Sequence, residues 1–183
     1  VVGREADVKA KLEASGLGDA VSELQIVNAA NTENLAEYKA FLYKRLQRKG
    51  HDRHDVHRLA ARDRHVFASL MLAHGHGDGL VTGATRKSSH VLDLINHVFD
   101  ADAEHGAVGV TAVMHKGRVV LIADTLVHEW PDETDLANIA ERSAGVARHL
   151  GLEPRVAFVS FSTFGYPRSE RSEKMHLAPN VLE

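Results

Sequence analysis

The sequence predicts an α/β protein built as a three-layer α/β/α sandwich, and three observations support this class. Segments with helical apolar spacing alternate along the chain with short runs rich in Val, Ile and Leu. The chain has 183 residues, of which 44% are hydrophobic, so it is long enough to bury a core. Two β-rich runs separated by His115, Lys116 and Gly117 predict a hairpin. One antiparallel pair is therefore expected beside parallel strands.

Helices are predicted where apolar residues recur every three or four positions and a capping residue or glycine marks an end. Ser88 or Ser89 is expected to cap one helix, and Gly50 and Gly151 are expected to end two others. The predicted helices cover residues 5–14, 31–50, 55–73, 88–99, 132–150 and 170–177.

Strands are predicted where short apolar runs are bounded by turn residues. These runs are residues 24–27, 79–83, 108–114, 118–123 and 155–161. Val1 and Val2 resemble the end of a further strand. Because the chain begins with Val and stops just after a strand–helix unit, we expect a partial domain cut from a longer protein.

Composition excludes several classes of function. Lys plus Arg is 22 and Asp plus Glu is 25, and the net charge of −3 argues against a nucleic-acid-binding protein. No apolar run approaches the roughly 20 residues that span a bilayer, so no membrane partner is expected. The absence of cysteine excludes disulfides, thiolate metal sites and cysteine nucleophiles, and it favours the cytoplasm.

The first candidate site lies between a predicted strand and a predicted helix, at residues 83–89. Backbone amides at a helix N-terminus, hydroxyls, and the Arg86 and Lys87 side chains suit a phosphate group. The alternative is an ordinary loop with a capping serine. The spacing does not match a Walker A loop.

The second candidate follows another predicted strand, at residues 160–165. Small hydroxyl residues and Gly165 would let a ligand approach the backbone closely. Ser160 stands where a nucleophile elbow requires glycine, so Ser162 is not expected to act as a hydrolase nucleophile.

Other polar residues have weaker signals. His51, His54 and His57 recur at intervals of three, which spreads them around a helix, so a solvated face is favoured over a metal site. Asp124 follows an apolar run and either orients a ligand or caps a turn. The cations between Tyr43 and Gly50 either complement a helix dipole or contribute to an anion pocket.

Taken in order, these segments resemble the phosphate acetyltransferase family, most closely the phosphotransacetylase-like C-terminal domain of bacterial NADP-dependent malic enzymes. The resemblance covers essentially residues 1–183 and is most specific near its end. The segments that carry it are 43–50, 79–86, 123–125 and 153–165, continuing through Pro167 and residues 170–172.

The resemblance implies an isocitrate/isopropylmalate dehydrogenase-like sandwich with two subdomains and a cleft, and homo-oligomers that are dimers or larger. It implies acetyl-CoA or CoA as the ligand. Arg45 or Arg48 would lie near the position of a functional arginine. The residues it places near a phosphate or CoA-type pocket are Thr85, Arg86, Ser88, Ser162, Thr163 and Gly165.

Departures from the family pattern bear on activity. Active transacetylases usually carry Arg where this chain has Asp93, and Lys where it has Phe164. Their catalytic Ser-Arg motif lies beyond Glu183. The resemblance therefore implies no catalytic residue and no cofactor or metal within residues 1–183. It implies NADP and Mg or Mn in an N-terminal malic enzyme domain of the parent protein.

Four functions remain open at this stage. The first is an acyl-CoA-binding, oligomerising regulatory domain of a malic enzyme, whose parent converts malate to pyruvate by oxidative decarboxylation. The second is an active phosphate acetyltransferase that makes acetyl phosphate and CoA from acetyl-CoA and phosphate. The third is an oligomerisation module without a ligand, and the fourth is a metal-dependent hydrolase built on the histidines.

Overall fold

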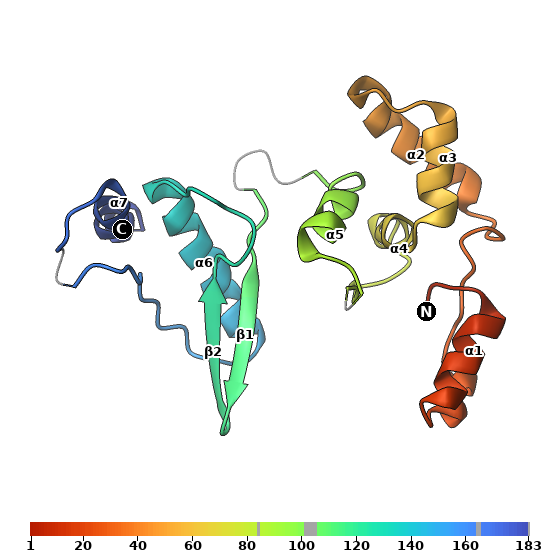
Figure 1. Ribbon diagram of the computed structural model, residues 1–183, viewed down its shortest axis with the longest axis horizontal. Helices are drawn as coiled ribbons and strands as arrows, with labels where there is room; N and C mark the ends of the chain where they lie inside the picture. Colours follow the sequence, from red (N-terminus) through yellow and green to blue (C-terminus); the bar gives the residue numbers. More distant parts are fainter. Residues whose placement is uncertain (84, 101–105, 164–165, 183) are drawn as a thin grey trace. The chain divides into compact units, whose positions relative to one another are not determined.

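The computed structural model describes residues 1–83, 85–100, 106–163 and 166–182. The chain divides into two compact units, Val1–Asp100 and Ala101–Glu183 (Figure 1). They are called unit 1 and unit 2 below. In the described ranges, no helix combines the length and the apolar character needed to cross a membrane.

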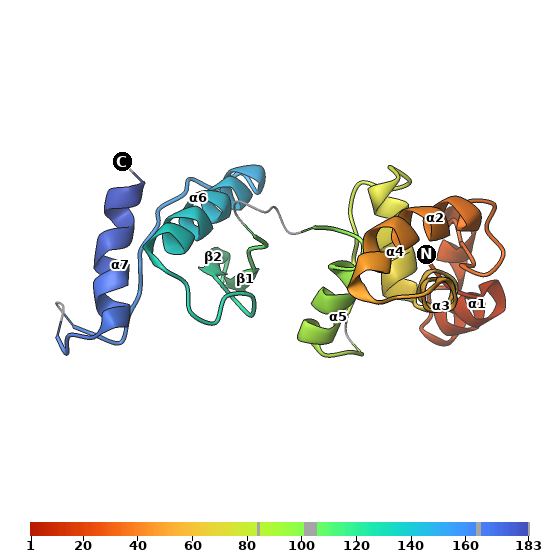
Figure 2. The same ribbon diagram turned by 90° about the horizontal axis from the view of Figure 1, so that it is seen from above.

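Unit 1 is helical. Its elements are α1 (Glu5–Ala14), the 3₁₀ helix η1 (Gly18–Glu23), α2 (Leu35–Leu46), the 3₁₀ helix η2 (Gln47–Lys49), α3 (Arg53–Arg62), α4 (Arg64–Ala73) and α5 (Ser88–Ile95). Helix α2 packs against α3, α3 against α4, and α4 against α5 (Figures 1 and 2). Apolar residues at helical spacing supply the core. They include Tyr38, Leu42 and Leu46 from α2, Val56 and Ala60 from α3, and Val66, Phe67 and Leu70 from α4.

Unit 2 combines a hairpin with two helices. Strands β1 (Val110–His115) and β2 (Arg118–Ala123) pair antiparallel. Their two-residue turn, Lys116 and Gly117, has φ of 47° and 76°, and positive φ at both positions is typical of tight hairpin turns. Helix α6 (Glu133–His149) packs on β2, and α7 (Glu170–Val181) packs on α6 (Figure 2).

The α/β class and most predicted elements are confirmed. The structure has helices close to the predicted 5–14, 31–50, 88–99, 132–150 and 170–177, and the predicted hairpin forms. Gly50 and Gly151 end their helices with φ of 89° and 73°, a conformation that favours glycine.

The predicted helix at residues 55–73 is wrong as one element, because the chain breaks at Asp63. This residue has φ −94° and ψ 118°, and its carboxylate accepts the amides of His65 and Val66 at 2.9 and 3.2 Å. An aspartate that caps the following helix in this way ends α3 and starts α4.

Three predicted strands do not form within the described residues. Residues 79–83 and 155–161 are irregular, and residues 24–27 contribute only an isolated parallel bridge between Val27 and Val2. A strand needs a neighbour for its backbone hydrogen bonds. An apolar run indicates burial and does not reveal whether that neighbour is present.

Candidate functional site

The first candidate site is the connection between α4 and α5 in unit 1. Thr85, Arg86 and Lys87 are exposed there, and Gly83 adopts φ of 116°. The Thr85 amide donates to Gly83 O at 2.8 Å. His65 Nδ1 lies 2.6 Å from Thr82 Oγ1 and so links the connection to α4. The result is an exposed cationic loop that leads directly into α5.

The N-terminus of α5 has no side-chain cap. The predicted cap at Ser88 or Ser89 is wrong, because Lys87 occupies the cap position and both serines lie in the first turn. The first amides of a helix have no intrahelical acceptor, and the helix dipole adds partial positive charge there. Arg86 reaches along the helix and contacts His90, with 3.4 Å between guanidinium and ring nitrogens. The site presents donors and cations, which suits an anionic group.

The second candidate site is a turn in unit 2. The Ser162 amide donates to Ser160 Oγ at 3.2 Å, and the two hydroxyl oxygens are 3.3 Å apart. Thr163 and Tyr166 exchange backbone hydrogen bonds of 2.9 and 3.1 Å. Ser162 is half-buried and Thr163 is exposed. Gly165 and Phe164 lie outside the described residues.

The predicted ligand residues therefore fall into two local groups. Thr85, Arg86 and Ser88 are adjacent in unit 1, whereas Ser162 and Thr163 form their own turn in unit 2. Each group has hydroxyls and backbone amides on one short segment.

Asp124 has the structural role that the sequence left open. Its side chain is 4% exposed, and its oxygens accept the Gly109 and His128 amides, each at 2.6 Å. His128 Nδ1 lies 2.6 Å from the same carboxylate. These contacts fix the turn after β2.

Arg45 also has a structural role in unit 1. Its guanidinium lies 2.6 Å from an Asp100 carboxylate oxygen and 5.6 Å from the centre of the Phe41 ring. An arginine whose guanidinium pairs with a carboxylate and lies over an aromatic ring stabilises the packing of its own unit. The contacts connect the end of α2 with the segment after α5.

The histidines described here lie beside a helix cap and beside a buried tyrosine. His54 lies with Asp52 and Asp55 in the one group of described residues whose three ligand-type atoms fall within 4.8 Å of one another. Both of these carboxylates already serve as the capping box of α3. His74 and His76 pack against the Tyr38 ring, with centroid distances of 4.8 and 5.9 Å.

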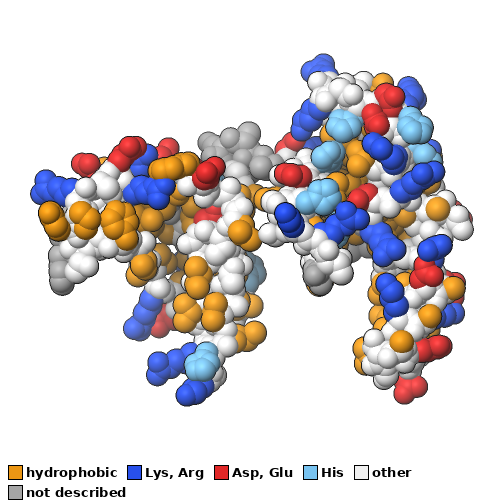
Figure 3. All heavy atoms as spheres, viewed as in Figure 1, with side chains coloured by type: hydrophobic (Ala, Val, Ile, Leu, Met, Phe, Trp, Pro, Cys, Tyr) orange, Lys and Arg blue, Asp and Glu red, His pale blue; other side chains and the backbone are white. Residues whose placement is uncertain are grey.

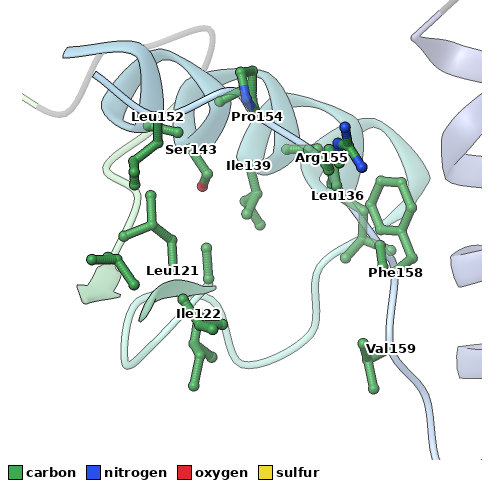
Figure 4. Close-up of a pocket in the computed structure, with 18 of the residues that line it drawn as sticks. Leu121, Ile122, Leu136, Ile139, Ser143, Leu152, Pro154, Arg155, Phe158 and Val159 are labelled. Carbon is green, nitrogen blue, oxygen red and sulfur yellow. The ribbon is translucent and has the colours of Figure 1, made fainter. Parts of the chain in front are cut away.

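A hollow of about 710 Å³ in unit 2 was not predicted from the sequence (Figure 4). It is called the β2–α6 groove here. Its walls are β2, one face of α6 and the irregular residues 152–159, and Met175 of α7 also lines it. The α6 residues that line it are Leu136, Ile139, Ala140, Ser143, Ala144 and Ala147. The sequence feature that could have indicated this groove is the recurrence of small residues, Ala140, Ser143, Ala144 and Ala147, at helical spacing along one face of α6.

Comparisons with known proteins agree over the whole chain. The sequence profile of the phosphate acetyl/butaryl transferase family matches residues 1–183. The chain is 43% identical over 183 residues to an NADP-dependent malic enzyme from Rhizobium meliloti, covering 100% of this chain and 24% of that protein. It is 30% identical over 185 residues to a phosphate acetyltransferase from Bacillus subtilis, covering 100% of this chain and 56% of that protein.

A solved structure supports the fold. The EutD phosphotransacetylase from Staphylococcus aureus matches with a TM-score of 0.81 at 24% identity, over 100% of this chain and 54% of that one. The chain thus spans about a quarter of the malic enzyme relative and about half of the phosphate acetyltransferase relative. The predicted resemblance is confirmed: the chain belongs to the phosphate acetyl/butaryl transferase family.

Proposed function

We propose that this chain is the phosphotransacetylase-like domain of an NADP-dependent malic enzyme, and that it binds acetyl-CoA or CoA as a regulatory ligand. The 43% identity to a malic enzyme over the full chain supports this parent. The parent would convert malate to pyruvate in the cytoplasm, with NADP and Mg or Mn bound outside residues 1–183.

The α4–α5 connection is the observation that carries the ligand proposal. Arg86 and Lys87 stand beside the uncapped amides of α5, and all of these groups are exposed. The phosphates of CoA are anions that accept hydrogen bonds, so they match this combination of charge and donors. Thr85 and Ser88 would add hydroxyl donors. For unit 2, the resemblance separately assigns Ser162, Thr163 and Gly165 to ligand binding, and we include them in the proposal on that ground.

Asp93 favours binding without acetyl transfer. It is exposed on α5, five residues after Ser88, at a position where active transacetylases carry a cation. Transfer between CoA and phosphate develops negative charge that positioned cations must stabilise. A carboxylate at this place opposes that charge.

Regulation would follow from linkage. A ligand changes the activity of a distant site only if it binds one conformational or assembly state more tightly than another. We propose that acetyl-CoA binding to this domain shifts such an equilibrium in a homo-oligomer, dimeric or larger. The complete domain would be the three-layer sandwich that the resemblance implies.

An active phosphate acetyltransferase is the second candidate. The 30% identity to the Bacillus subtilis phosphate acetyltransferase, again over the full chain, favours it. In that case the CoA thiolate would attack the carbonyl carbon of acetyl phosphate, and inorganic phosphate would leave as acetyl-CoA forms.

The decisive experiment uses the full-length protein. NADPH formation from malate is followed while acetyl-CoA is titrated, in the wild type and in Arg86→Ala. Loss of a charge-assisted contact should raise the half-inhibitory concentration by about tenfold or more. The matched control is Arg58→Ala, which removes an exposed arginine of α3 whose partner is Asp55. This variant should respond like the wild type.

Three results would contradict the proposal. Without malate turnover, the parent assignment fails. If the rate of malate turnover does not change with acetyl-CoA concentration, the remaining function for this domain is an oligomerisation module without a ligand. Formation of acetyl phosphate from acetyl-CoA and phosphate by the same preparation favours the transferase.

A further inference from the structure

Another hollow, of about 450 Å³, lies in unit 1 and is lined by two imidazoles and one carboxylate. They belong to His51, which follows η2, and to Asp93 and His97, at the C-terminal end of α5. The other lining residues are Leu46, Lys49 and Asn96. We propose that this hollow, called the His51–His97 site below, binds a divalent transition metal ion of the Zn²⁺ class through His51, Asp93 and His97. The ion would fasten the end of α5 to the turn after α2, and the proposal does not depend on acetyl-CoA.

The backbone fixes the tautomer of His97. Its Nδ1 lies 2.6 Å from the carbonyl oxygen of Asp93, about one helical turn earlier. A carbonyl only accepts, so Nδ1 donates, and in the neutral ring Nε2 then carries the lone pair that a metal needs. Histidines that bind metals commonly donate their other ring nitrogen to a backbone carbonyl in this way. Arg45 Nε also donates to the His97 carbonyl oxygen at 3.4 Å, which anchors this residue to α2.

The chain reversal after α2 places His51 beside His97. Gly50 has φ of 89°, and the His51 amide donates to Leu46 O at 3.3 Å, a bond that commonly closes a helix end around a left-handed glycine. The centres of the two imidazole rings are 5.5 Å apart, with 74° between the ring planes. Two imidazoles on one tetrahedral Zn²⁺, with Zn–N bonds of about 2.1 Å, have their centres about 5 Å apart. The ring spacing therefore suits a shared ion.

Asp93 supplies the third ligand and a negative charge. It lies four residues before His97, a spacing that puts two side chains on one face of a helical segment, and both residues line the hollow. The ligand atoms of the three residues are not all within 4.8 Å of one another. Asp93 is exposed, so its carboxylate can rotate toward an ion that the two imidazoles hold. Water would take the fourth position, as in other zinc sites with three protein ligands.

The mixture of charges favours a metal ion over an anion. The Lys49 ammonium would repel a metal ion, but Lys49 is exposed, so its flexible side chain can extend its charge into solvent. An anion in the hollow would instead meet the Asp93 carboxylate. Imidazole nitrogen is a preferred ligand of Zn²⁺, whereas Mg²⁺ prefers oxygen, so the ligand set selects the first class of ion.

The His51–His97 site differs from the histidine pattern visible in the sequence. Figure 3 shows several histidine side chains over unit 1, among lysines and arginines. His54 and His57 are exposed on α3, and the carboxylates next to His54 already form the capping box of that helix. His51 and His97 are half-buried and line one hollow. The spacing of His51, His54 and His57 could not indicate this pair, because His97 comes from another helix.

The first test is footprinting of histidines in the full-length protein with diethylpyrocarbonate, which modifies accessible imidazoles. Excess Mg²⁺ is present throughout to occupy sites built from oxygen ligands. Saturating Zn²⁺ should lower the modification of both His51 and His97 by about tenfold, and that of His54 and His57 should stay unchanged. Unchanged modification of the pair, equal protection of all four histidines, or the same protection of the pair by inorganic phosphate would overturn the metal site.

The second test reads the affinity at the site itself. In His97→Ala the Zn²⁺ concentration that half-protects His51 should rise by about tenfold or more, because one ligand is lost. His51→Ala should do the same to the protection of His97, and Asp93→Asn should raise the concentration for both histidines.

His149→Ala is the matched control. His149 Nδ1 contacts the carbonyl oxygen four residues earlier, at 2.8 Å from Gly145 O, as His97 does, but His149 lies on α6 in unit 2. This variant should protect His51 and His97 at the wild-type Zn²⁺ concentration. If His97→Ala leaves the protection of His51 unchanged, or if His149→Ala weakens it equally, the two imidazoles do not share an ion.

Discussion

The carboxylate of Asp124 is tied to the backbone of Gly109, whose amide donates to Asp124 Oδ1 at 2.6 Å. The second oxygen accepts from the His128 amide, and Thr125 donates its own amide to Gly109 O at 3.0 Å. These bonds close the base of the hairpin, where the chain enters β1 and leaves β2. A buried carboxylate with several donors is satisfied and holds its neighbours in place.

We expect Gly109→Ala to destabilise unit 2. A Cβ atom at this position would lie 2.1 Å from Thr125 O and 2.9 Å from Asp124 Oδ1. Because the first clash is with backbone, the hairpin base must shift, at a cost of about 2 kcal/mol or more. Hydrogen exchange of β1 and β2 amides in the full-length protein measures this loss.

The same substitution at Gly145 is its control. Nothing lies within 4 Å of a Cβ there, and the residue is inside α6. Because alanine favours a helix more than glycine, Gly145→Ala should stabilise α6 by up to about 1 kcal/mol. If both variants accelerate exchange equally, the steric explanation is wrong.

The sequence predicted helices and their ends well where the apolar spacing and the capping residues lie within one short segment. Residues 5–14 form α1 as predicted, and Asp132 and Gly151 bound α6 as their capping chemistry requires. The break at Asp63 was missed because an apolar helical pattern continues through it. Residues 155–161 were predicted as a strand from apolar character, but pairing depends on a neighbour that no local pattern reveals.

The candidate site was predicted only in part, for a similar reason. The exposed cations at Arg86 and Lys87 follow from their place before a helix. The packing role of Arg45 depends on Asp100, 55 positions along the chain, and so could not be read from the helix alone. The β2–α6 groove depends on several separate segments, which only the folded chain brings together.

Asp132→Ala should weaken α6 at its start. The Asp132 carboxylate accepts the Asp135 amide at 2.8 Å, and the Asp135 carboxylate accepts the Asp132 amide at 3.0 Å. Loss of such a cap costs about 1 kcal/mol, so amides of α6 should exchange about fivefold faster. Asp132→Ser keeps a capping oxygen and should recover most of the protection. Failure of serine to do so would show that the cap is not the cause.

Tyr38 should make unit 1 sensitive to alkaline pH. Burial raises the pKa of the Tyr38 phenol above its usual value, and its hydroxyl lies 2.5 Å from His76 Nδ1. Above pH about 10 the unfolded state loses this proton while the folded state keeps it. The unfolded state then binds fewer protons, so stability falls as pH rises through this range.

The test compares the wild type with Tyr38→Phe. The variant should lose about 1 kcal/mol at pH 7, where the hydrogen bond to His76 disappears. Its stability should then decline less steeply above pH about 10. Unit 1 amide exchange at several pH values, corrected for intrinsic exchange rates, gives both quantities. An unchanged alkaline decline would remove Tyr38 as its source.

Asp93→Asn should strengthen the response to acetyl-CoA if the α4–α5 connection binds its phosphates. Asp93 lies five residues after Ser88, which is about 7.5 Å along the axis of α5. This separation is within the Debye length of about 8 Å at physiological ionic strength, so the carboxylate repels an anion at the helix start. The half-inhibitory concentration in the malate assay should fall about two- to fivefold, and the gain should shrink as salt is added.

Glu37→Gln, an exposed charge change on α2, is the control and should leave the response unchanged. Because Arg86→Ala and Asp93→Asn shift the response in opposite directions, general destabilisation cannot account for both. Equal responses of the wild type and Asp93→Asn at low salt would instead place the anion away from this end of α5.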